Sequence, residues 1–303
     1  MPDRHRPSRA SADRGPRPQP QPGTWSTASG VVELARSGSD GRAWTVFVNG
    51  VASSSVHTGD PTVLEFEYLR WMADVLDERE PAGGPLEVVH LGAAGCALAR
   101  YVDATRPGSR QVAVEVDEDL ARLVREWFDL PRSPALRLQV GDARERLATR
   151  RDASADAVVR DVFAGDTTPR HVRTLEFTRD VARVLRPDGT YLANVADRPP
   201  LKKLRREVAT VAEVFEHVGV LAETGLLRGR RYANAVVVAS PAPLPADRLV
   251  RRAARAPVPT RWVDGDDLVE LVAGARPEHD PVPPGEPVAG PEVGPDVGEH
   301  GAG

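Results

Sequence analysis

Three acidic residues of the sequence, Glu115, Asp142 and Asp161, lie at the ends of apolar runs that are typical of buried strands. In an open parallel sheet the carboxyl ends of the strands meet at one edge, and ligands bind outside it. Carboxylates accept hydrogen bonds from hydroxyl and amine groups. We therefore assign Glu115 to ribose hydroxyls, Asp142 to the exocyclic amine of a purine, and Asp161 to a group beyond the nucleoside. The alternative for each acid is a helix cap without a ligand.

A loop of small residues precedes the first of these acids. Gly92, Ala93, Ala94 and Gly95 link an apolar run to a helical pattern. Small side chains let backbone N–H groups approach a ligand at a helix N-terminus, and an acid about 20 residues further on can accept both ribose hydroxyls. A dinucleotide-binding loop would need glycine where Ala94 and Ala97 stand. The loop therefore favours a compact nucleoside over a dinucleotide, and tight packing of strand on helix without a ligand is the alternative.

The single cysteine, Cys96, lies in this loop. A helix N-terminus can lower a thiol pKa, but a small buried residue that fills the loop is the interpretation we favour. One cysteine excludes an internal disulfide and an all-cysteine metal site. We expect no bound metal.

Composition limits the class of protein. The chain has 303 residues, 41% hydrophobic content and a net charge of -4, which gives no global reason to expect nucleic acid or an anionic membrane as a partner. No apolar run approaches the roughly 18 residues of a membrane span, and the start of the sequence lacks the apolar segment of a signal peptide. We expect a soluble, cytoplasmic protein.

Local patterns divide the chain into five parts. The predicted parts are a disordered basic tail (1–29), a small antiparallel β unit with a hairpin at Asn49-Gly50 (30–60), a core (61–240), a helical extension that docks as a helix pair (241–275) and a disordered acidic tail (276–303).

Within the core, strands and helices alternate, which specifies a parallel sheet with helices on both faces. We predict a Rossmann-like, doubly wound α/β sheet that is mostly parallel with an antiparallel last strand. One expected helix begins at Asp60-Pro61-Thr62 and another spans 118–128. A short helix ends near Thr149, the next runs from about Pro169 to Arg186, and the last spans 201–217. The expected strands span 86–91, 112–114 with Glu115-Val116-Asp117 at its end, 136–140, 155–159, 191–195, a stretch near Val218, and 233–239.

Several motifs together resemble a known family. HLGAAGC, VEVD, GDA, the strand that ends at Asp161 and LRPDG look like class I S-adenosylmethionine-dependent transferases. The β unit and the segment Glu65-Phe66-Glu67-Tyr68 narrow the resemblance to spermidine synthases, over about residues 31–240.

The resemblance implies a donor, an acceptor and residue roles. The donor is S-adenosylmethionine or decarboxylated S-adenosylmethionine, and the acceptor is a small-molecule amine; a homodimer is left open. By resemblance, Glu115 binds the ribose and Asp161 orients and deprotonates the attacking amine. The remaining implied roles are the loop Gly92, Ala93, Ala94 and Gly95 beside the donor's tail, Asp142 and Ala143 beside the adenine, and Tyr68 in the polyamine pocket.

The sequence departs from the family at the acceptor site. Spermidine synthases have a second aspartate three residues after the first, where this chain has Ala164; the glutamine or histidine usual after the pocket tyrosine is Leu69; and the acidic residue of the glycine-rich loop is replaced by Gly95. Burying an ammonium group without a partner is costly, which argues against putrescine as the acceptor. A methyltransferase and a nucleoside-binding protein without turnover are the alternative functions.

Overall fold

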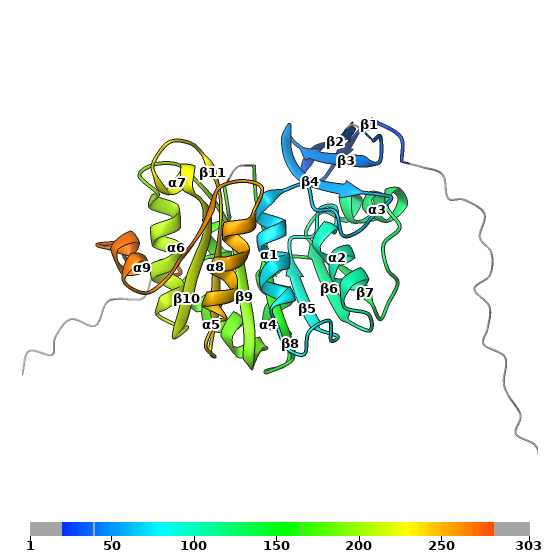
Figure 1. The fold of residues 1–303 in the computed structure, drawn as a ribbon. Coiled ribbons are helices and arrows are strands. Elements are labelled where there is room, and N and C mark those ends of the chain that lie inside the picture. The colour runs from blue at the N-terminus through cyan, green and yellow to red at the C-terminus, as the bar shows by residue number, and fades with distance from the viewer. Residues whose placement is uncertain (1–19, 39, 166, 282–303) are drawn as a thin grey trace, which may run out of the picture.

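Two β-sheets form the framework of the computed structural model, which describes residues 20–38, 40–165 and 167–281. The small sheet has the strand order β1-β2-β3-β4, and the large sheet has the order β12-β10-β11-β9-β8-β5-β6-β7. The small sheet lies over one end of the large sheet, near α2 and α3 (Figure 1). The strands are β1 Gly23–Thr27, β2 Gly30–Ser37, β3 Ala43–Val48, β4 Val51–His57, β5 Glu87–Leu91, β6 Arg110–Glu115, β7 Leu136–Val140, β8 Ala155–Arg160, β9 Leu185–Asp197, β10 His217–Glu223, β11 Ala233–Ser240 and β12 Thr260–Val263.

Helices cover both faces of the large sheet. Buried residues of α1, α2, α3 and α8 form one apolar cluster with one face, and those of α4, α5, α6 and α9 form a second cluster with the other. The helices are α1 Glu67–Asp77, α2 Ala97–Thr105, α3 Glu118–Trp127, α4 Ala143–Ala148, α5 Leu175–Val184, α6 Lys202–Ala212, α7 Thr224–Leu227, α8 Ala246–Arg255 and α9 Gly265–Val272, with a 3₁₀ turn, η1, at Arg170–Val172.

Strand direction confirms the predicted fold class. Strands β5 to β9 are parallel to their neighbours within that group, whereas β11 is antiparallel to both β9 and β10. Strand β12 is antiparallel to β10. Two strands of the large sheet therefore oppose the rest, where the sequence predicted one.

The small sheet forms by antiparallel pairing of successive strands. Asn49 and Gly50 make the two-residue turn between β3 and β4, with φ values of 51° and 76°. Positive φ at both turn residues matches the twist of the two strands, and asparagine and glycine adopt it most readily. The hairpin predicted at this position is confirmed.

The boundary predicted for the basic tail is wrong. Strand β1 lies inside the range 1–29, and the Trp25 ring packs on Trp127 with the ring centroids 4.8 Å apart. The Thr27 hydroxyl and the Ser29 N–H donate to Asp117 Oδ2 at 2.6 and 2.8 Å. These contacts with residues about 90 positions away order a segment whose local composition predicts disorder. Residues 1–19 lie outside the described part of the chain.

Helix boundaries differ from the prediction in three helices, one of which, α6, ends at Ala212 rather than at residue 217. Helix α1 begins at Glu67 rather than at residues 60–62, because Asp60 Oδ1 accepts from the N–H and hydroxyl of Thr62 and forms a turn there. The helix expected from Pro169 is divided into η1 and α5, and Thr174 caps α5. That helix ends at Val184, and the next strand already begins at Leu185.

The C-terminal extension is a helix, a strand and a helix rather than a helix pair. Trp262 and Val263, which we placed in a helix pair, lie in β12 and join the sheet beside β10. The acidic tail predicted from residue 276 is also ordered at its start, because Glu278 is buried against α5 and α6. Residues 282–303 lie outside the described part.

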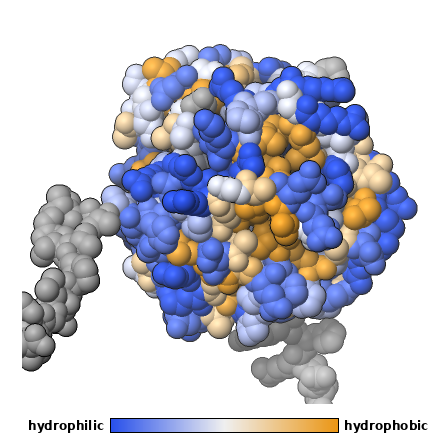
Figure 2. Space-filling model, turned by 90° about the vertical axis from the view of Figure 1, so that its left-hand side faces the viewer, coloured by the Kyte–Doolittle hydropathy of each residue, from blue (hydrophilic) through white to orange (hydrophobic). Residues whose placement is uncertain are grey.

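The surface of this extension is partly apolar. Val250 on α8 and Val269 on α9 are 51% and 72% exposed. The side of the molecule shown in Figure 2 has an apolar area surrounded by hydrophilic residues. Among the described residues no helix has the length and apolar character needed to cross a bilayer.

Replacing Trp25 with alanine tests the corrected boundary. We expect Trp25→Ala to lower the free energy of unfolding by about 1–3 kcal/mol, because it removes a half-buried ring and its contact with Trp127. Urea unfolding followed by circular dichroism measures the change. Val31→Ala, at a position 48% exposed on β2, is the control and should change stability by less than about 0.5 kcal/mol. Equal stability of the Trp25 variant and the wild type would show that β1 does not stabilise the fold.

Candidate active site

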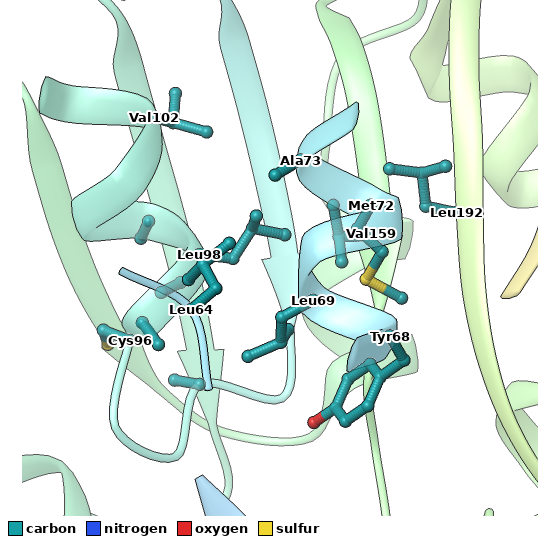
Figure 3. Close-up of a cluster of buried hydrophobic side chains, with 14 of the residues drawn as sticks. Leu64, Tyr68, Leu69, Met72, Ala73, Cys96, Leu98, Val102, Val159 and Leu192 are labelled. Carbon is teal, nitrogen blue, oxygen red and sulfur yellow. The ribbon is translucent and has the colours of Figure 1, made fainter. Parts of the chain in front are cut away.

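Asp161 follows the last residue of β8 and is held by two neutral donors. The Tyr68 hydroxyl donates to Asp161 Oδ2 at 2.9 Å, and Asn194 Nδ2 donates to Asp161 Oδ1 at 2.8 Å. Tyr68 comes from the first turn of α1 and Asn194 from near the C-terminal end of β9. Figure 3 shows the Tyr68 hydroxyl pointing away from the apolar side chains around it. Each carboxylate oxygen thus receives one hydrogen bond, which fixes the orientation of the carboxylate.

A buried ion pair lies directly behind this carboxylate. The guanidinium of Arg160 is 2.9 Å from Glu207 Oε1, and both side chains are almost completely buried. The same guanidinium donates to the carbonyls of Val172 and Asn194 at 3.0 and 3.2 Å. Arg160 therefore connects β8 to β9 next to Asn194 and ties both to η1. Removing one partner of such a pair leaves an uncompensated buried charge.

Burial controls the ionisation of the site. Burial raises the pKa of Asp161 above its usual value, although the hydrogen bonds from Asn194 and Tyr68 and the charge of Arg160 oppose the shift. The pKa of Tyr68 is raised well above its ordinary value, by burial first and then by the negative charge of Asp161. Tyr68 therefore remains a hydrogen-bond donor at neutral pH.

Two glycines allow the loop to pass close to its neighbours. Gly92 has a φ of +84°, and a Cβ there would lie 2.2 Å from the Asp161 carbonyl oxygen. A Cβ at Gly95 would lie 2.6 Å from Ser54 Oγ on β4. Ala94 and Cys96 also have positive φ values, of 35° and 55°, which cost about 1–2 kcal/mol each for a side chain with a Cβ. The loop is therefore a constrained turn that contacts both Asp161 and the small sheet.

Glu115 holds this turn from the neighbouring strand. Its Oε2 accepts from the N–H groups of Ala93 and Ala94 at 3.3 and 3.1 Å, and its Oε1 accepts from the Asp117 N–H at 3.1 Å. Burial raises the pKa of Glu115 and the three backbone hydrogen bonds oppose the shift. Oε2 thus accepts two N–H groups, whereas Oε1 accepts one and retains a lone pair for a ribose hydroxyl. The structure thus gives Glu115 a role in holding the loop, and ribose binding by Glu115 stays a prediction.

Asp142 has the capping role that the sequence left open. Its Oδ1 accepts from the N–H groups of Arg144 and Glu145 at the start of α4, at 2.9 and 3.0 Å. Its Oδ2 lies 2.8 Å from His171 Nε2 in η1. Hydrogen bonds from Glu145 and His171 keep the pKa of Asp142 low despite partial burial. The carboxylate is charged and oriented, and Ala143 beside it is buried.

A cavity of about 40 Å³ joins the loop to Asp161. The residues that line it include Tyr68, Leu69, His90, Asp161 and the loop residues from Gly92 to Ala94. Burial lowers the pKa of His90 to about 4, so its ring is neutral at neutral pH. Of the predicted site residues, Tyr68, Gly92, Ala93, Ala94 and Asp161 share this cavity, whereas Gly95, Glu115, Asp142 and Ala143 do not line it.

Sequence reasoning missed Asn194 and His171. A single polar residue within the apolar run 191–195 was a usable signal for Asn194, because a buried amide in a strand needs a partner. No local signal marks His171, whose partner is 29 positions away. No group of three or more His, Cys, Asp or Glu side chains in the described ranges is arranged to hold a metal ion.

The geometry and the sequence are those of a known group of proteins. The crystal structure of a probable spermidine synthase from Corynebacterium glutamicum is 37% identical to this chain, with a TM-score of 0.82, over 87% of this chain and 98% of that one. This chain belongs to the spermidine synthase family. The resemblance inferred from the motifs is therefore confirmed, together with the transferase class.

Two polyamine aminopropyltransferases are also similar to this chain, at lower sequence identity. A polyamine aminopropyltransferase from Neisseria meningitidis is 26% identical over 204 residues, which are 66% of this chain and 74% of that protein. One from Chromobacterium violaceum is 28% identical over 142 residues, which are 46% of this chain and 53% of that protein. The match thus spans about half of the Chromobacterium protein. No family model matches the chain.

The thiol in the loop gives a direct test of the site's packing. Burial raises the pKa of Cys96 to about 12, with the charge of Glu115 as a smaller cause. At about pH 8 the thiolate fraction is then roughly one part in 10⁴, so a thiol reagent should not label the native protein within minutes. One label per chain should appear in denaturant, because the sequence has one cysteine. Fast labelling of the native protein would show that the loop is open.

Proposed function

We propose that this chain transfers an aminopropyl group from decarboxylated S-adenosylmethionine to the nitrogen of a small amine. The observation that carries the proposal is the environment of Asp161, a half-buried carboxylate whose hydrogen-bond partners, Tyr68 and Asn194, are both neutral. Arg160, whose charge acts on Asp161, is paired with Glu207. An ammonium group at this position would give the carboxylate a direct cationic partner.

The order of the strands matches the order of the donor's parts. Strands β8, β5, β6 and β7 are neighbours in the sheet, and they end in Asp161, the Gly92 loop, Glu115 and Asp142. Neighbouring strands are roughly 4.8 Å apart, so these groups form a row along one edge. In our proposal the amine acceptor lies at Asp161, the donor's tail at the loop, the ribose at Glu115 and the adenine at Asp142.

The chemical step needs a positioned amine and a proton acceptor. The donor supplies a sulfonium: as the amine nitrogen bonds to the adjacent carbon, the carbon–sulfur bond breaks and its electron pair stays on sulfur. Asp161 orients the amine and takes its proton, and the Tyr68 hydroxyl and Asn194 amide keep the carboxylate directed toward it. Alignment of this kind and proton removal are the two contributions that a protein makes to such a displacement.

The surroundings of the loop favour the decarboxylated donor. S-adenosylmethionine keeps a carboxylate that needs a cation or free N–H groups near the loop. Arg100, the nearby candidate, donates to the His57 carbonyl at 3.0 Å and is buried there. The N–H groups of Ala93 and Ala94 are used by Glu115. A methyltransferase remains the second candidate because a methyl group suits a cavity of about 40 Å³ better than an aminopropyl chain does.

The acceptor site supports an amine other than putrescine. Leu69, where the family has a polar residue, lines the cavity beside Tyr68 and Asp161 and offers no partner for a second ammonium group. The homodimer stays a proposal, supported by the apolar area in Figure 2, and sedimentation equilibrium would measure it.

Asp161→Asn separates chemistry from binding. The variant keeps the shape of the side chain but cannot take a proton, so we expect turnover with any accepted amine to fall by about 10²–10⁴. The affinity for the nucleoside product methylthioadenosine, measured by calorimetry, should stay within about threefold. Assays of the wild type with both donors and a panel of amines come first.

Asp119→Asn, on the exposed face of α3, is the matched control and should leave turnover unchanged. Retained activity of Asp161→Asn would exclude the proposed role of this carboxylate. Absence of transfer by the wild type with either donor would leave a nucleoside-binding protein as the better interpretation.

A further inference from the structure

The C-terminal segment Glu278–Asp280, which we call the acidic strap, crosses the ends of α5 and α6. The Glu278 carboxylate contacts Arg170, Arg173 and Arg206 at 2.8, 3.2 and 3.1 Å, and its side chain is 8% exposed. The Glu278 carbonyl accepts from the Leu175 N–H at 2.7 Å. One buried carboxylate thus contacts an arginine of η1, an arginine just after η1 and an arginine of α6. The acidic residues that led us to predict a disordered tail here instead hold the segment against the core.

Asp280 extends the acidic strap to α4. Its two carboxylate oxygens accept from the two terminal nitrogens of Arg144 at 2.7 and 2.5 Å. Such a bidentate pair is among the stronger and more directional contacts of a protein. Arg144 also donates to the His171 carbonyl at 3.2 Å, and its own N–H donates to Asp142. The strap therefore holds Arg144 at the point where α4 meets η1.

His171 completes the connection to Asp142. The η1 residues on either side of it are fixed, because Arg170 contacts Glu278 and the Val172 carbonyl accepts from Arg160. The ring of His171 then meets Asp142 Oδ2 at 2.8 Å. Asp142 Oδ1 already caps α4, so Oδ2 is the oxygen with a lone pair left for a ligand, and His171 sets its direction.

We propose that the acidic strap positions the donor's base: through Arg144 and His171 it orients Asp142 to accept from the 6-amino group of adenine. The inference rests on the proposed function, which places adenine at Asp142. The strap and His171 are positioning residues, because they act through Asp142 rather than on the reacting atoms.

Base discrimination tests this role. Methylthioadenosine has a 6-amino donor, whereas methylthioinosine has a 6-oxo acceptor that Asp142 cannot bind. Calorimetry of both compounds gives a preference ratio for each full-length variant. Glu278→Gln and Asp280→Asn should each reduce the wild-type preference for adenine by about fivefold, the change expected for one ordinary hydrogen bond. Asp280→Glu, which keeps the carboxylate, should restore most of it.

Controls separate positioning from stability. Asp152→Asn breaks another aspartate–arginine pair, with Arg183 of α5, and should leave the ratio unchanged. Asp280 is about one third exposed, so Asp280→Asn tests the strap even if the Glu278 variant fails to fold. A ratio that stays at the wild-type value in Asp280→Asn, with or without a fall in melting temperature, would overturn the inference.

The variant Asp142→Asn shows which proposal fails, the role of the acidic strap or the placement of adenine at Asp142. If the wild type prefers adenine and Asp142→Asn abolishes the preference, adenine lies at Asp142 and only the role of the strap is in question. If the wild type binds neither compound, or Asp142→Asn leaves the ratio unchanged, the proposed placement of the donor is wrong and the strap inference is overturned with it.

Discussion

A half-buried carboxylate, Asp161, held by two neutral donors is the interaction on which this site depends. Burial disfavours the charged form of Asp161, and the Tyr68 hydroxyl and the Asn194 amide only partly offset that cost. The arrangement requires α1 and β9 to bring their polar side chains to the end of β8. It also requires Gly92, because any side chain there would collide with the Asp161 carbonyl. The fold thus keeps a carboxylate whose loss of solvation is only partly offset. This carboxylate lies at the edge of the sheet outside which ligands bind.

Two sets of charged contacts keep that edge in place. The Arg160–Glu207 pair lies beneath Asp161 and joins β8, β9 and η1. The acidic strap acts from outside, through arginines of η1, α4 and α6. Both sets meet at η1, whose His171 contacts Asp142. The Asp161 end and the Asp142 end of the proposed site are therefore connected through η1. The position of η1 thus affects both the acceptor end and the adenine end of the site.

Sequence patterns correctly predicted the elements that local interactions determine. The strand 136–140 has the predicted bounds, and the three acids lie at strand ends as expected, because apolar periodicity and turn residues specify these elements. The elements that the sequence failed to predict depend on contacts between residues far apart in the chain. Strand β1 depends on Trp127 and Asp117, and the strap depends on arginines up to about 136 positions away. The partner of Asp161 on β9 was likewise hidden, because an asparagine inside an apolar strand reveals its burial but not its partner.

The most direct test is a carbon-13 NMR titration of the Asp161 carboxyl group, without and with a saturating primary amine such as propylamine. The account predicts that, without the amine, this carboxyl titrates above its ordinary pKa because burial disfavours its charged form. Binding of the amine should lower that pKa, because an ammonium group stabilises the carboxylate. A carboxyl that titrates at or below its ordinary pKa, and does not respond to the amine, would contradict the account.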